Sequence, residues 1–186
     1  MSRFARHDTP LAGLVALQRQ ALQDSRGFLS RIFCAEELAL VGWSGPIAQI
    51  NHTLTAQRGS LRGLHFQRSP YAEIKLVSCL RGSVFDVAVD VRAGSPTYLQ
   101  WHGQVLSADN QTAFLIPAGF AHGFQTLEKN CEMLYCHSAP FHKGSEDGLN
   151  ALDPALAIAW PLPPAERSER DRQLPLVSSH FQGVVL

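Results

Sequence analysis

The two-residue alternation of side chains over Ser83–Arg92 is the sequence feature that most constrains the fold. One face of this run would carry Phe85, Val87, Val89 and Val91, and the other Val84, Asp86, Ala88 and Asp90. Because successive side chains of a strand point to opposite faces, the run predicts a β-strand that packs against other residues on both faces. From residue 47 to 137, further short β-type runs lie between Gly, Pro, Asn and Ser. Many short strands at this spacing predict an all-β sandwich or barrel, in which closure protects the sheet edges.

The flanking segments predict smaller elements around this β region. Residues 10–33 predict strands broken at the turn-like cluster Asp24–Gly27, and residues 34–42 predict a short helix. In the tail, residues 165–173 predict a short helix with proline at its start. We find no repeat or linker, and a chain of 186 residues suits one domain with a sizeable core.

Composition excludes several classes of function. Hydrophobic residues make up 45% and charged residues 17% of the chain, and its formal net charge is zero. No overall basic field therefore indicates nucleic acid or a membrane surface as partner. No apolar run approaches the roughly 20 residues of a membrane span. The N-terminus lacks the apolar core of a signal peptide, and the four cysteines form no C-x-x-C pair. We therefore expect a cytoplasmic protein with reduced thiols.

Two histidines are the first candidates for chemistry. His65 lies in the apolar run Leu61–Gln67 with Arg62 and Gly63, and His122 lies in Ile116–Phe124. Imidazoles between phenylalanine and glycine in β-type sequence are expected in a partly dry pocket, where histidine can act as a base near neutral pH. The alternative for His65 is a core histidine bonded to a carbonyl.

Lys75 and Tyr135 extend the candidate set. A lysine within an apolar strand is costly unless it faces a cavity or a partner, and Asp86 or Asp90 would be that partner. A turn at residues 68–71 would bring Lys75 beside His65 on the same pocket wall. The alternatives are a structural ion pair for Lys75 and a core position for Tyr135.

A metal centre is the rival use of the histidines. Metalloenzymes built on a double-stranded β-helix use H-x-H, a following Glu and a later His, but Gly63 occupies the first place and no Glu follows His65 closely. Two neutral nitrogens without a carboxylate make a poor divalent-cation site, so we expect no metal.

Blocks of sequence from about residue 24 to 175 carry a family resemblance. They are Asp24–Phe28, Gln49–His52, Leu61–Gln67, Lys75–Val77, Gly82–Asp90, Ser95–Thr97, Ile116–Phe124, Leu134–Tyr135, Asp153–Leu156, Trp160–Pro161 and Ser168–Asp171. In this order and spacing they resemble the dTDP-4-dehydrorhamnose 3,5-epimerases. The resemblance implies a cupin-type double-stranded β-helix (jelly roll) with short peripheral helices. It also implies a homodimer involving residues 10–33, and a tail, residues 161–186, that contributes Asp171.

The same resemblance implies an activity and residue roles. The enzyme would invert C3, C5 or both in a 4-keto-6-deoxy nucleotide-diphosphate sugar through an enolate, without a cofactor. His65 would be the base, paired with Asp171, and Tyr135 the acid on the opposite face, while Lys75, held by Asp86, would stabilise the enolate. The implied substrate contacts are Arg26, Arg31, Gln49, Asn51, Arg62, His122, Phe141, Glu146 and Arg170.

Departures from the family pattern leave the nucleotide open. Arg31 replaces a common glutamate, Ile50 a common acid and Cys136 a common lysine, so the carrier is dTDP, CDP or another nucleotide. The remaining alternatives are a 3,4-ketoisomerase on the same scaffold, a non-catalytic nucleotide-sugar binding module and a metal-dependent cupin.

Overall fold

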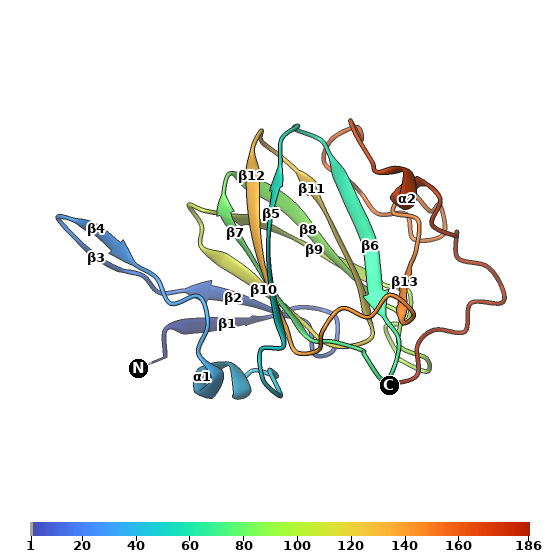
Figure 1. Cartoon of the computed structure of the whole chain (residues 1–186), viewed down its shortest axis with the longest axis horizontal. Coiled ribbons are helices and arrows are strands. Elements are labelled where there is room, and N and C mark those ends of the chain that lie inside the picture. Colours follow the sequence, from blue (N-terminus) through green and yellow to red (C-terminus); the bar gives the residue numbers. More distant parts are fainter. Residues whose placement is uncertain (1) are drawn as a thin grey trace.

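The computed structural model describes residues 2–186, which form two antiparallel sheets packed face to face (Figure 1). The six-stranded sheet runs in the order β1 (Phe4–Asp8), β2 (Val15–Arg19), β10 (Thr112–Ile116), β7 (Lys75–Arg81), β12 (Cys131–His137) and β5 (Gln49–Thr55). The five-stranded sheet runs β13 (Glu146–Gly148), β6 (Leu61–Gln67), β11 (Phe120–Thr126), β8 (Ser83–Asp90) and β9 (Trp101–Ser107). The expected all-β, cupin-type fold is confirmed.

The core between the sheets follows the alternation of β8. Val84 and Ala88 point into the space between the sheets, whereas Val87 and Val89 pack on the outer face of the five-stranded sheet. Phe114 on β10 and Met133 on β12 face the same inner core from the other sheet. Both faces of the predicted strand are therefore used, as its sequence indicates.

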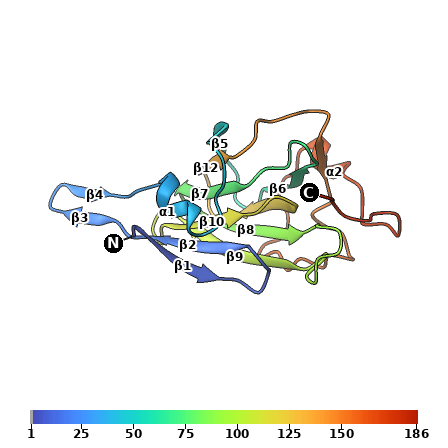
Figure 2. The ribbon, with the colours of Figure 1, turned by 90° about the horizontal axis from the view of Figure 1, so that it is seen from below.

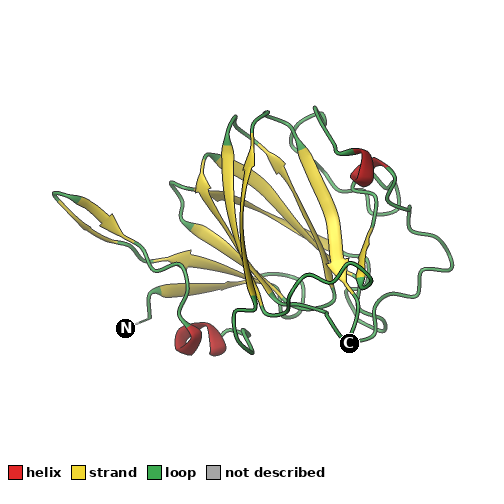
Figure 3. Ribbon diagram, viewed as in Figure 1, coloured by secondary structure: helices red, strands yellow, loops and turns green. Residues whose placement is uncertain are grey.

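Two peripheral segments cover the outer faces. The region of α1 (Ala35–Ala39) places Leu38 against the six-stranded sheet. The C-terminal segment, which includes α2 (Glu169–Arg172), crosses the five-stranded sheet and packs Phe181 and Val184 on it. These two helices are short beside the strands (Figure 3). The tail helix begins later than its prolines predict, because Ser168 is its N-cap and accepts a hydrogen bond from the Asp171 amide.

A two-stranded hairpin of β3 (Leu22–Asp24) and β4 (Gly27–Leu29) stands apart from both sheets, and two views show it projecting from the body (Figures 1 and 2). The predicted turn at Asp24–Gly27 is confirmed as its tip. Strand β1 was not predicted, because four of its five residues are at least partly exposed and give no apolar pattern. None of the described helices is long and apolar enough to cross a membrane.

Candidate active site

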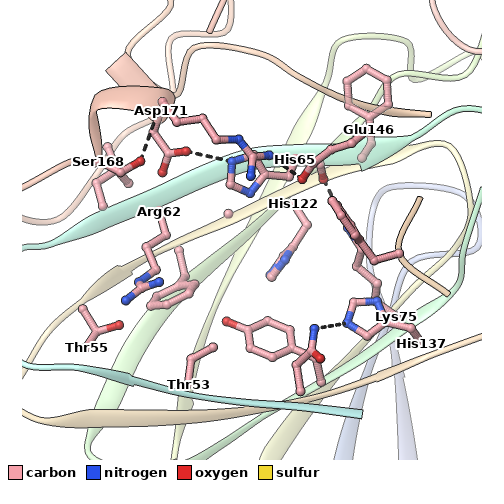
Figure 4. Close-up of a pocket in the computed structure, with 18 of the residues that line it drawn as sticks. Thr53, Thr55, Arg62, His65, Lys75, His122, His137, Glu146, Ser168 and Asp171 are labelled. Carbon is pink, nitrogen blue, oxygen red and sulfur yellow. Dashed lines mark hydrogen bonds and ion pairs between the residues drawn. The ribbon is translucent and has the colours of Figure 1, made fainter. Parts of the chain in front are cut away.

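A pocket of about 470 Å³ opens between the two sheets (Figure 4). Strands β5, β7 and β12 line one wall, and β6 and β11 line the other. Phe141 in the connection after β12, Glu146 at the start of β13 and the segment from Glu166 to Asp171 contribute to its rim. Residues from distant parts of the sequence thus meet in one cavity.

His65 and Asp171 form a hydrogen-bonded pair on the β6 wall. The Nε2 atom of His65 lies 2.8 Å from Oδ1 of Asp171, although the residues are 106 positions apart. The other oxygen of Asp171 accepts the backbone N–H of Gly63 at 3.1 Å. Burial acts to raise the pKa of Asp171, but its bonds with His65, Gly63 and Ser168 outweigh burial and lower it. Asp171 is therefore an ionised partner that orients the imidazole.

Gly63 makes this pairing possible. Its φ is +106°, and a Cβ atom there would lie 2.6 Å from the carbonyl oxygen of His122 on the neighbouring strand. The β6–β11 register shifts at the same place, which marks an irregularity in the ladder. Glycine is required because no larger residue fits this close approach. At this irregularity the Gly63 amide donates to Asp171.

Tyr135 and Lys75 lie on the facing wall. Tyr135 is on β12 and Lys75 on β7, in the six-stranded sheet, whereas His65 belongs to the five-stranded sheet. The prediction that Lys75 and His65 share a wall was therefore wrong: the turn at residues 68–71 crosses between sheets. Lys75 Nζ nevertheless reaches the His65 carbonyl at 3.2 Å. Burial, then the charge of Asp86, raises the pKa of Tyr135, so its phenol stays protonated at neutral pH.

Asp86 does not hold Lys75, which corrects the prediction from sequence. Its two carboxylate oxygens lie 2.9 and 3.0 Å from Nε2 of His122, and both residues are buried. Burial raises the pKa of Asp86, and His122 opposes that effect. Asp90, the other candidate partner, pairs with Arg92 outside the pocket. The ammonium of Lys75 is instead paired with Glu73 at 3.0 Å.

Most of the predicted substrate contacts lie around the pocket. The lining includes Gln49, Asn51, Arg62, His122, Phe141, Glu146 and Arg170. Arg170 and Glu146 form an ion pair at the rim, which joins the tail to the start of β13. The predicted contacts Arg26 and Arg31 lie outside the lining of this chain's pocket. Arg26 pairs with Asp24 on the hairpin, and Arg31 pairs with Glu37 near α1.

Sequence reasoning missed several pocket residues. His137 follows Tyr135 by two positions on β12, and Thr53 and Thr55 continue the Gln49–Asn51 face of β5. The two-residue period of a strand was a signal that places them on the pocket face. Glu73 precedes β7, where no periodic pattern exists, so its contact with Lys75 had no sequence signal.

His137 stays neutral in this site. Burial, followed by the positive charge of Lys75, lowers the pKa of His137 from 6.5 to about 4. Its Nε2 atom lies 3.5 Å from the Asn51 amide nitrogen. At neutral pH this imidazole therefore presents a hydrogen-bonding surface without charge.

The arrangement suits proton transfer at carbon. An imidazole with its carboxylate stands on one wall, and a protonated phenol and an ammonium stand on the other. A base, an acid on the opposite face and a fixed cation are what inversion beside a carbonyl requires. Among residues 2–186, no group of three or more His, Cys, Asp or Glu side chains is placed to hold a metal ion.

Comparisons with known proteins identify the family. A family model for dTDP-4-dehydrorhamnose 3,5-epimerase matches residues 8–179. The dTDP-4-dehydrorhamnose 3,5-epimerase of Sinorhizobium fredii is 43% identical over 155 residues, which cover 81% of this chain and 77% of the relative.

Two solved structures are also similar over most of the chain. One is the dTDP-6-deoxy-D-glucose-3,5-epimerase of Legionella pneumophila in complex with dTDP-4-keto-L-rhamnose, which superposes with a TM-score of 0.90 at 38% sequence identity. The match covers 98% of this chain and 99% of the Legionella chain. A 3'-monoepimerase from Streptomyces bikiniensis, in complex with dTDP-quinovose, has a TM-score of 0.85 at 34% identity, with coverages of 91% and 86%. The chain belongs to the dTDP-4-dehydrorhamnose 3,5-epimerase family.

Proposed function

We propose that this protein is an isomerase that inverts C3, or both C3 and C5, of a dTDP-linked 4-keto-6-deoxy sugar. The observation that carries the proposal is one pocket with the His65–Asp171 pair on one wall and Tyr135 and Lys75 on the other. The names of the similar proteins supply the substrate class, because they act on or bind dTDP sugars.

Each inversion begins with removal of a proton beside the C4 ketone. His65 takes the proton, the electron pair of the C–H bond forms a C=C bond, and the carbonyl π pair moves to oxygen. Lys75 stabilises the resulting enolate oxygen, and Asp171 stabilises the imidazolium. Tyr135 then donates a proton to the opposite face, and the carbonyl re-forms. Exchange with water returns His65 and Tyr135 to their starting forms, so no cofactor or metal takes part.

The nucleotide part of the substrate occupies the pocket mouth. Arg62 lines the pocket and supplies forked N–H donors that suit diphosphate oxygens. Phe141 is 53% exposed at the rim, where its ring is free to stack on a base. Gln49 holds this position, since its Oε1 accepts the Phe141 amide at 2.9 Å.

The working enzyme is a homodimer in which the β3–β4 hairpin docks on a second copy. Phe28 and Leu29 are 64% and 67% exposed on a ribbon that packs on neither sheet. An isolated two-stranded ribbon is marginal in water, so it needs a surface. The outer face of β5 offers one, with Ile50 57% and Leu54 55% exposed. Docking there brings Arg26 toward the partner's pocket, where it serves the diphosphate.

The cytoplasm is the compartment that fits this enzyme. Cys79, Cys131 and Cys136 are buried free thiols. Free thiols persist in reducing compartments.

The decisive experiment uses dTDP- and CDP-linked 4-keto-6-deoxyglucose in heavy water, followed by NMR. Wild-type protein is expected to exchange protons at C3, or at C3 and C5, and to form inverted product from the dTDP sugar. The His65→Ala variant is expected to lose exchange by roughly 10²–10⁴-fold, the usual contribution of a general base.

The same spectra separate the alternatives. Exchange at C3 alone identifies a monoepimerase, and a product with its ketone moved to C3 identifies a 3,4-ketoisomerase instead. Tight binding without exchange in the wild type would show a binding module. Normal exchange in His65→Ala would refute the base assignment, and loss of wild-type activity with a chelator would refute metal independence.

A further inference from the structure

Glu73 is a buried carboxylate at the pocket that the proposed mechanism does not use. Glu73 and Lys75 are each 7% exposed, and Oε1 of Glu73 lies 3.0 Å from Nζ of Lys75. The second oxygen, Oε2, accepts the Gln67 side-chain amide at 2.9 Å. Both oxygens of this carboxylate are therefore engaged, and one of them holds the lysine.

The donors of Lys75 can be accounted for one by one. A lysine ammonium has three N–H donors. One is directed at Glu73 and one at the His65 carbonyl, 3.2 Å away, which leaves one for a ligand in the pocket. We infer that Glu73 is a positioning residue, which fixes Lys75 so that this remaining N–H meets the enolate oxygen. The inference rests on the proposed function.

Gln67 prevents the carboxylate from turning away. Its Oε1 accepts the His142 amide at 2.6 Å, so its NH₂ group is directed toward Glu73 and the Pro140 carbonyl. The Tyr71 ring stacks on His142 with centroids 4.0 Å apart. This network joins Lys75 to the segment that carries Phe141. The ammonium is thereby ordered before substrate arrives, which is the condition for effective charge stabilisation.

Glu73 is also the counterion of Lys75. Asp86 is committed to His122, so among residues 2–186 Glu73 is the carboxylate that pairs with Lys75. Without Glu73, the buried ammonium would have no carboxylate partner and would not be held in one position.

The test is Glu73→Gln, assayed in the full-length protein by deuterium exchange and by kcat and KM. We expect kcat to fall roughly 10–100-fold with KM within about 3-fold, because the lost interaction forms in the transition state. Glu73→Asp keeps the charge but shortens the reach, so it should recover part of the kcat that Glu73→Gln loses.

Controls separate positioning from a structural role. Asp8→Asn removes an exposed carboxylate pair with Arg6 on the edge strand β1, away from the pocket, and should change neither kcat nor KM. In a Lys75→Met background, Glu73→Gln should have little further effect on kcat. A Glu73→Gln enzyme with wild-type kcat, or one altered only in thermal midpoint, would overturn the inference. An inactive wild type would instead overturn the proposed function, and the inference with it.

Discussion

At the residue scale, His137 is a half-buried imidazole whose lowered pKa makes the stability of the fold depend on pH. With a pKa lowered from 6.5 to about 4, it takes up no proton in the folded state between these values. The unfolded chain does take one up there. Stability therefore falls as pH drops from about 6.5 toward about 4, because the unfolded state binds more protons in that window.

The prediction is that His137→Asn is less sensitive to acid than the wild type. Between pH 7 and pH 5, its loss of unfolding free energy should be smaller by about 1–2 kcal/mol, after allowance for partial solvent access. Urea titrations at both pH values measure this difference. A variant with the same acid sensitivity as the wild type would show that His137 does not titrate between folded and unfolded states.

The sequence predicted which residues belong to the site where a residue lies in a distinctive local motif. The His65 block and the tail motif with Asp171 were both recognised, and the structure brings them to 2.8 Å. The predicted partner of Asp86 was wrong, because alternation gives the face on which a side chain lies but not its neighbour on the adjacent strand. Asp86 pairs with His122 on the adjacent strand β11, and that pairing depends on the order of strands in the sheet.

At the scale of elements, the residues of the β3–β4 hairpin are exposed, and the hairpin belongs to neither of the two large sheets. Leu22, Phe28 and Leu29 are at least half exposed, and Arg26 at its tip is paired with Asp24 alone. The sequence predicted the turn from Asp24–Gly27, because turn residues act locally. It did not reveal how far the hairpin stands from the pocket, because that depends on the tertiary arrangement.

We predict complementation between two impaired variants, compared at a substrate concentration below KM. Arg26→Ala should weaken activity mainly through KM, and His65→Ala should lower it roughly 10²–10⁴-fold. Mixed and reassociated in equal amounts, they should recover about a quarter of wild-type sites, because a mixed dimer pairs the intact hairpin of one copy with the intact pocket of the other. A mixture no more active than the sum of its parts would mean that the hairpin does not serve a second copy.

At the scale of the whole molecule, stability and chemistry occupy different parts of the sandwich. The inner core is apolar around Phe114 and Met133, both fully buried, whereas the pocket between the same sheets is lined by polar groups. The division was predictable in outline from the apolar runs of the strands. The order of strands in each sheet was not, because neighbours such as β10 and β2 are distant in sequence.

This division predicts that Phe114→Ala lowers stability without changing the reaction. The cavity should cost about 3–5 kcal/mol of unfolding free energy. Because Phe114 does not line the pocket, kcat measured well below the unfolding temperature should stay within about 2-fold of wild type. Thermal melts and exchange assays on the same sample test both statements, and Phe114→Leu provides a milder variant if the first fails to fold. A large fall in kcat for folded protein would contradict the separation.

The separation of His65 and Asp171 along the chain determines when their pair can form during translation. A ribosome makes the histidine long before its carboxylate, and 106 positions of chain must follow before the pair exists. Fragments released before residue 171 would hold the imidazole, the ammonium and the phenol, yet would lack the carboxylate that contacts His65. Under the roles proposed above, we expect such incomplete translation products to be inactive toward sugar nucleotides.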